Sequence, residues 1–215
     1  MAIEKVKRKL SVSLYLLALV VTVIIFLTGI YVGTEISKSI NAKVMDEVNA
    51  VSQSTLSLQL LLLMEPSEDF CPVFSEEIEE IDSKVDLLGN KLTYIEDVKE
   101  EHDPELKKEY FSLEFDSYLL HKKINGICGI KSQIILYFYS NENCGEPCNS
   151  QGEELTKLRE SEKVILYTFD GSLDSSVVKA LKSKFGISTY PTLIINEEKF
   201  VGLKTKTQIL NILTN

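Results

Sequence analysis

The feature that most constrains this chain is an uncharged run of 25 residues, from Leu10 to Thr34. Folded as a helix at ~1.5 Å per residue, about 23 such residues span roughly 34 Å, which exceeds a bilayer core of about 30 Å. A signal peptide usually has an apolar core of only about 7–15 residues before a small-x-small cleavage site. This run is longer and ends at Gly29-Ile-Tyr-Val-Gly33, a poor cleavage site. We therefore predict an uncleaved transmembrane signal anchor over residues 10–34, with a cleaved signal peptide as the alternative.

Charge is distributed unevenly around this segment. Residues 1–9 form a short basic N-terminus, and residues 1–33 together carry +3, whereas the whole chain of 215 residues carries −9. Because short basic flanks stay in the cytoplasm, we expect a single-pass protein of the cell membrane with an extracytoplasmic C-terminal body. The lipid bilayer is then a partner through residues 10–34. The acidic body argues against nucleic acid as a partner, since phosphate binding needs clustered Lys and Arg.

Helical periodicity continues after the apolar run. Apolar residues at helical spacing predict a helical stalk over residues 35–70, which we expect to be broken at Glu65-Pro-Ser-Glu-Asp69. Two further apolar seams step by three and four residues, and they predict an antiparallel, coiled-coil-like helical hairpin over residues 71–128. The seams are Phe74, Ile78, Ile81, Val85, Leu88, Leu92 and Ile95, then Leu106, Tyr110, Leu113, Leu120, Ile124 and Ile127. Between them, Glu101-His-Asp-Pro104 predicts a turn, with Asp103 as the N-cap of the second helix and Pro104 at its first position.

The helical periodicity gives way to short continuous apolar runs in residues 129–215, which we interpret as a separate α/β domain. Continuous apolar runs at 134–139 and 164–169 predict buried strands, and 192–195 with 199–203 predicts a hairpin. Helices are expected at about 148–161, 173–185 and 205–213. This order of strands and helices predicts a mixed sheet with helices on both faces.

Three features of this domain coincide. Cys144-Gly-Glu-Pro-Cys148 follows the first strand and begins a helix, Tyr190-Pro191 precedes the third strand, and Gly202 comes before the last helix. With these motifs, residues 131–215 resemble the thioredoxin-like family. The resemblance implies a redox-active Cys144–Cys148 pair, a cis Pro191 facing it, and a backbone beside Tyr190 that is free to bind an extended substrate segment. Three residues separate the cysteines here, a CxxxC motif, where the family usually has two.

The chemistry of the pair follows from its place at a helix start. Unpaired N–H groups and the helix dipole lower the pKa of a thiol there and raise its thiolate fraction, whereas Glu146 opposes this effect. Cys144, nearer the loop, would attack a substrate disulfide, and Cys148 would resolve the mixed disulfide. We therefore predict a membrane-anchored thiol–disulfide oxidoreductase that acts on protein thiols and disulfides outside the cytoplasm. It needs no external cofactor, but a redox partner must reset the pair.

Two other functions remain open at this stage. One is a redox-silent interaction scaffold, because the long acidic helices contribute no obvious catalytic group. The other is copper handling, because membrane-anchored copper-delivery proteins of the Sco type combine a similar fold with a three-residue cysteine spacing. Those proteins add a distal His ligand, whereas His102 and His121 both lie in the helical segment here. We interpret His121 as a helix-surface residue and His102 as a turn residue, and we predict no metal site.

The remaining cysteines flank the predicted hairpin. Cys71 precedes its first helix and Cys128 follows its second, so antiparallel packing would place them at the same end. Four cysteines allow three connectivities, and an exported compartment favours disulfides over zinc. We favour a structural Cys71–Cys128 disulfide together with Cys144–Cys148.

Overall fold

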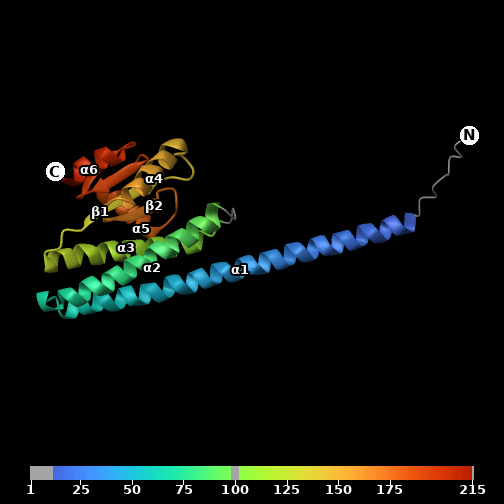
Figure 1. Cartoon of the computed structure of the whole chain (residues 1–215), viewed down its shortest axis with the longest axis horizontal. Helices are drawn as coiled ribbons and strands as arrows, with labels where there is room; N and C mark the ends of the chain where they lie inside the picture. Colours follow the sequence, from blue (N-terminus) through green and yellow to red (C-terminus); the bar gives the residue numbers. More distant parts are fainter. Residues whose placement is uncertain (1–11, 98–101, 215) are drawn as a thin grey trace, which may run out of the picture. The chain divides into compact units, whose positions relative to one another are not determined.

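The computed structural model describes residues 12–97 and 102–214. Two compact units, Met1–Lys43 and Val44–Asn215, divide the chain. Helix α1 (Val12–Met64) begins in the first unit and ends in the second (Figure 1). The two units are described separately below.

The first unit contains the apolar part of α1. Its large side chains are exposed along the helix, and an 18-residue window has a mean hydropathy of 2.6 with no part of it buried. Within it, the hydroxyls of Thr22 and Thr28 donate to the carbonyls of Ala18 and Ile24, at 2.9 and 2.8 Å. Internal satisfaction of polar groups is what a lipid environment requires. This segment has the length and composition of a membrane anchor or of a signal sequence.

In the second unit, the rest of α1 packs with α2 (Cys71–Asp97) and α3 (Pro104–Cys128), and a short 3-10 helix, η1 (Glu68–Phe70), precedes α2. Each helix buries a seam with steps of three and four residues. On α1 the buried seam is Val44, Val48, Val51, Thr55, Leu58 and Leu62. Every residue of the predicted α2 seam is buried as well.

The ends of the helices are fixed by local interactions. Asp103 is the N-cap of α3 and accepts the N–H of Leu106 at 3.0 Å, with Pro104 in the first turn, as the sequence predicts. Glu101, the first residue of the predicted turn, lies outside the described residues. At the other end, a Cys71–Cys128 disulfide joins the start of α2 to the end of α3, with Cα atoms 5.7 Å apart.

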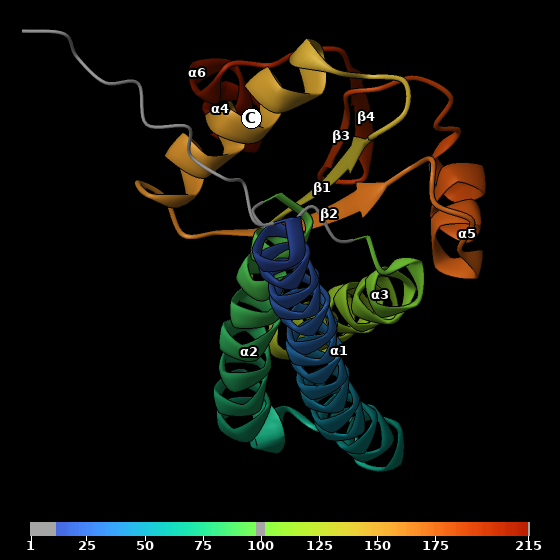
Figure 2. The same cartoon turned by 90° about the vertical axis from the view of Figure 1, so that its right-hand side faces the viewer.

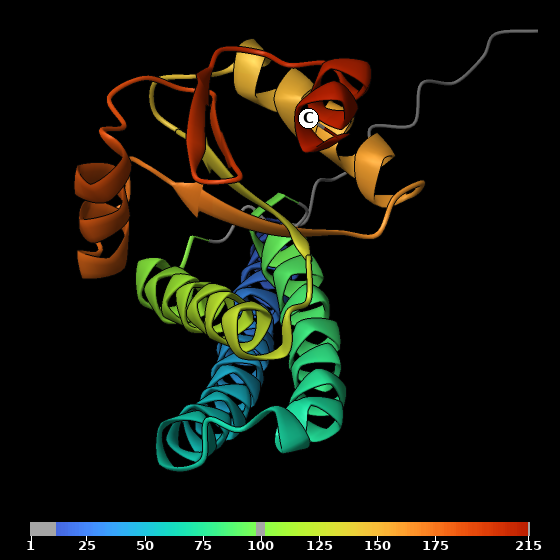
Figure 3. The same cartoon turned by 90° about the vertical axis from the view of Figure 1, so that its left-hand side faces the viewer.

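The α/β part contains a four-stranded mixed sheet in the order β2-β1-β3-β4. β1 (Gln133–Tyr139) pairs parallel with β2 (Val164–Asp170) and antiparallel with β3 (Thr192–Ile195). β4 (Glu198–Val201) completes the sheet as an antiparallel neighbour of β3. The helices are α4 (Glu146–Arg159), α5 (Ser176–Phe185) and α6 (Lys206–Thr214). α4 and α6 cover one face of the sheet, while α3 and α5 lie on the other (Figures 2 and 3).

The two faces of the sheet have different cores. On the first face, residues of β1 and β3 pack against α4 and α6, and the fully buried members are Ile135, Leu155, Leu158, Leu193, Ile195 and Ile209. On the second face, the ring of Phe169 lies 5.4 Å from that of Phe138 and 5.5 Å from that of Phe111, a residue of α3. Helix α3 therefore belongs to the helical bundle and to the core of the sheet at once.

The interface between α3 and β2 also contains a buried carboxyl group. Glu114 is 2% exposed, and its Oε1 accepts the N–H of Thr168 at 3.1 Å and the hydroxyl of Tyr110 at 3.2 Å. Its Oε2 has no hydrogen-bond partner among the residues that the structure describes. Burial raises the pKa of this carboxyl well above its usual range, which favours the neutral acid.

Several element boundaries differ from the sequence prediction, including both ends of α4, which runs from Glu146 to Arg159 rather than over 148–161. α5 begins at Ser176 rather than near Leu173, because Leu173 and Ser175 donate backbone N–H groups within a turn after β2. β4 ends at Val201, so Gly202 lies after the strand, where its φ of 78° is a conformation that favours glycine.

Candidate redox site

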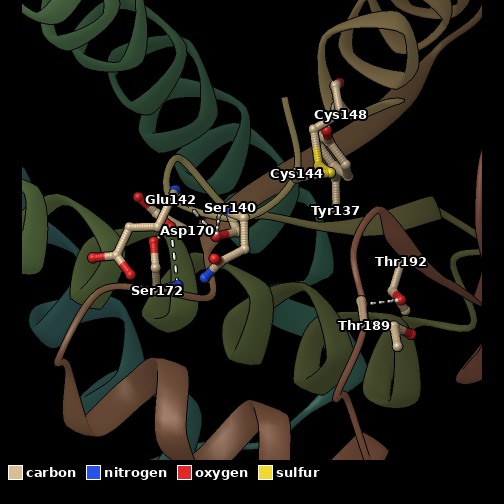
Figure 4. The surroundings of a disulfide bond; sticks show 10 residues. Tyr137, Ser140, Glu142, Cys144, Cys148, Asp170, Ser172, Thr189 and Thr192 are labelled. Atoms are coloured by element: carbon tan, nitrogen blue, oxygen red, sulfur yellow. Dashed lines mark hydrogen bonds between the residues drawn. A yellow bond between two sulfur atoms is a disulfide. The ribbon is translucent and has the colours of Figure 1, made fainter. Parts of the chain in front are cut away.

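The candidate site is the disulfide between Cys144 and Cys148, at the point where the chain passes from β1 into α4 (Figure 4). Cys144 lies in the loop and is partly exposed, whereas Cys148 lies in the first turn of α4 and is only 6% exposed. Their Cα atoms are 5.6 Å apart. Gly145 makes this spacing possible, because it is the N-cap of α4 and has a φ of 51°.

Hydrogen bonds hold the loop and the first helical turn in place. The buried Ser140 Oγ accepts the N–H groups of Glu142 and Asn143, at 3.3 and 3.1 Å. The carbonyl of Gly145 accepts the N–H groups of Cys148 and Asn149, both at 3.1 Å. These bonds fix the position of Cys144 relative to the helix.

Tyr137 lies on β1 beneath the pair. Its hydroxyl donates to the carbonyl of Cys148 at 2.7 Å, and burial raises the pKa of this phenol. The bond ties the first turn of α4 to the central strand of the sheet. The sequence indicated only a buried aromatic strand, and nothing in it showed that this hydroxyl would face the helix.

The Tyr190–Pro191 peptide bond is cis, and Thr189 and Thr192 on either side of it lie in the surroundings of the disulfide (Figure 4). The hydroxyl of Tyr190 donates to the carbonyl of Gly171 at 3.0 Å, and the Lys182 Nζ donates to the same carbonyl at 2.7 Å. The side chain of Tyr190 is therefore engaged within the protein. A substrate-binding role for this residue would rest on its backbone.

A buried ionic cluster stands at the carboxyl ends of β1 and β2. Lys107, only 5% exposed, reaches the carboxylates of Glu96 at 3.1 Å and Asp170 at 3.3 Å. Its ammonium also lies 5.6 Å from the ring of Tyr139, whose pKa is raised by burial and by nearby carboxylates. α3 thus contributes a buried cation that pairs with Asp170 at the end of β2. Sequence analysis missed this cluster, because a lysine on an acidic helix is usually solvated.

The prediction that His121 lies on the helix surface is wrong. His121 is 4% exposed, and its Nε2 lies 2.7 Å from the Asp82 carboxylate on α2. Ser117 Oγ donates to the same carboxylate at 3.1 Å and lies 2.9 Å from the Tyr167 hydroxyl. His121 is buried where α3 meets α2, and the neighbouring Ser117 also meets Tyr167 of β2. His102 lies exposed in the segment before α3.

The described part of the chain contains no cluster of side chains suited to bind a metal ion. Among residues 12–97 and 102–214, no group of three or more His, Cys, Asp or Glu side chains is placed to hold a metal ion. His121, which the copper hypothesis would need as a ligand, is instead paired with Asp82 of α2.

Comparisons with known proteins give limited matches. No protein-family model and no curated protein matches the chain. Among solved structures, one described as a malarial protein is 20% identical over 39% of this chain and 96% of its own, with a TM-score of 0.33. The germline-specific thioredoxin Deadhead of Drosophila melanogaster is 19% identical over 46% of this chain and 91% of its own, with a TM-score of 0.32. The mixed four-stranded sheet with its covering helices is compatible with a thioredoxin-like fold.

Proposed function

We propose that this chain is a membrane-anchored thiol–disulfide oxidoreductase that acts on protein disulfides outside the cytoplasm through Cys144 and Cys148. The observation that carries the proposal is the disulfide itself, with one cysteine partly exposed on a loop and the other buried in the first turn of a helix. An attacking thiol must reach its substrate, whereas a resolving thiol need only reach the attacking one. The apolar start of α1 would provide the anchor.

The cycle uses only this pair. The Cys144 thiolate attacks one sulfur of a substrate disulfide, and the first substrate thiolate leaves as the mixed disulfide forms. The Cys148 thiolate then attacks the sulfur of Cys144, which releases the second substrate thiolate and closes the internal disulfide. A partner dithiol then reduces the Cys144–Cys148 disulfide by the same exchange and becomes a disulfide itself, which returns the pair to its dithiol state. The backbone beside Pro191 would align the substrate segment.

The full chain, purified in a mild detergent, tests the proposal by insulin reduction with dithiothreitol as the electron donor. We expect Cys144→Ser to abolish the acceleration and Cys148→Ser to accumulate mixed disulfides that are visible on non-reducing gels. The matched control is the double variant Cys71→Ser with Cys128→Ser, which should retain activity. If the wild-type pair neither exchanges with dithiothreitol nor reduces insulin, the oxidoreductase proposal fails and the scaffold alternative takes its place.

A further inference from the structure

The last turns of α1 carry more apolar surface than their own bundle covers. Residues 48–64 contain no charge, in a chain of which 26% is charged. One side of this segment is the buried seam that packs within the helical bundle. On another side, Leu56, Leu60 and Leu63 are 54%, 51% and 72% exposed. One buried face is enough to hold a helix in a bundle, so a second apolar face indicates a further contact.

This second face has the spacing of a helix-packing seam. We call it the outer seam, and its five exposed residues are separated by steps of four, three, four and three positions: Asn49, Gln53, Leu56, Leu60 and Leu63. Steps that average 3.5 residues keep two supercoiled helices in contact over successive turns. The buried seam of α1 shows the same alternation of three and four. The outer seam is therefore suited to another helix.

The charge around the outer seam selects which helix that is. The whole chain carries −9, so two copies repel each other over most of their surface. The positions that flank the outer seam in the heptad are uncharged, namely Ser52, Ser57 and Gln59. Charges at these flanking positions are what usually choose the partner of a coiled coil. Their neutrality offers no complement to a charged helix, but it allows identical seams to meet without repulsion.

From this surface we infer that two copies of the chain associate through α1, with their outer seams packed in parallel as a short two-stranded coiled coil. The parallel sense rests on the anchor in the proposed function, because copies that keep the same basic flank in the cytoplasm have the same orientation. In a symmetric parallel pair, each seam residue meets its own counterpart, so Leu56, Leu60 and Leu63 form successive layers. The polar layer at Gln53 fixes the register, since a shifted pair would set it against leucine.

Cross-linking of the full chain, purified in a mild detergent without reductant, tests the contact. All four native cysteines are in disulfides, so an introduced cysteine is the only free thiol. We expect Leu60→Cys to give a covalent dimer with a short bismaleimide, because the two thiols face each other across the seam. Ser54→Cys is the matched control, since position 54 is exposed on the same helix but lies outside the outer seam, and it should give no dimer.

Light scattering of the detergent-solubilised chain measures the mass of the assembly. We expect the mass of two chains for the native sequence, and Leu60→Glu should lower it twofold, because two carboxylates would be buried opposite each other. Leu87→Glu is the matched control and should leave the mass unchanged, since Leu87 of α2 is 53% exposed and lies outside the outer seam. Far-ultraviolet circular dichroism checks that both variants fold.

Three results would overturn the inference. The first is a native mass of one chain, or a mass of two that Leu60→Glu does not change, because the contact would then lie elsewhere. The second is quenching of a fluorescent label on Leu60→Cys by nitroxide lipids in vesicles, because a lipid surface would then cover the seam. The third is cross-linking of Leu63→Cys to Asn49→Cys but not to itself, because an antiparallel pair contradicts the anchored orientation.

The two proposals fail separately. None of these measurements depends on the Cys144–Cys148 pair, so a monomeric chain that reduces insulin would refute only the association. A dimer without insulin reduction would refute only the oxidoreductase.

Discussion

The contribution of the Cys71–Cys128 disulfide to the free energy of unfolding follows from the number of residues in the loop that it closes. The disulfide joins residues separated by 57 positions, from the start of α2 to the end of α3. In the chain-entropy model, closing a loop of this length stabilises the folded state by about 4 kcal/mol, because it restricts the unfolded chain. Both cysteines are half-buried rather than fully buried, so serine at these positions keeps its hydroxyl near water. We therefore expect Cys71→Ser with Cys128→Ser to lower the free energy of unfolding by about 4 kcal/mol.

Urea unfolding of the full chain in detergent, followed by far-ultraviolet circular dichroism, measures this loss. The matched control is Cys144→Ser with Cys148→Ser, whose cysteines are only four positions apart. The same relation gives that variant a loss of about 2 kcal/mol. If removal of the long bridge reduced the unfolding free energy by less than removal of the short one, the loop-closure reasoning would be refuted.

Three further predictions concern groups buried around the sheet. The raised pKa of Glu114 means that its contribution is complete below the usual carboxyl pKa of 4.5 and is lost as the pH rises through the folded-state value. Stability should therefore fall above pH 4.5 by up to about 1.4 kcal/mol per pH unit, and Glu114→Gln should flatten this dependence in urea titrations at several pH values. Phe111→Ala should lower the unfolding free energy by about 3–5 kcal/mol in the same assay. It should destabilise the helical bundle and the sheet together, because the Phe111 ring packs on Phe169. Different unfolding midpoints by circular dichroism and by tyrosine fluorescence would contradict a shared core. A Cβ on Gly171 would lie 2.1 Å from the Tyr190 hydroxyl oxygen. Gly171→Ala should therefore displace the loop before Pro191 and raise the KM for insulin in the reduction assay. Gly152→Ala is the control, because its Cβ would meet no atom within 4 Å, and it should leave the KM unchanged.

Local pattern determined most of the elements of this fold. The α2 seam from Phe74 to Ile95 is buried at every predicted position, and the Asp103-Pro104 helix start is where the sequence places it. Strands β1, β2 and β3 begin and end within about one residue of prediction, since continuous apolar runs are typical of buried strands. The sequence also placed Cys144 before a helix and Cys148 within it.

What the sequence by itself could not determine depends on contacts between distant segments. The Lys107–Asp170 pair and the burial of Glu114 arise because α3 packs against a sheet that begins after it in the chain, and His121 is paired with Asp82 of α2. Helical periodicity reveals one buried face of α3, but it cannot show that a second face is covered by β2. The same holds for Tyr137, because strand alternation gives the side of the sheet and not the partner of a hydroxyl. Sequence thus determined the elements and the positions of Cys144 and Cys148 at a helix start, while tertiary packing decided which polar groups are buried around α3.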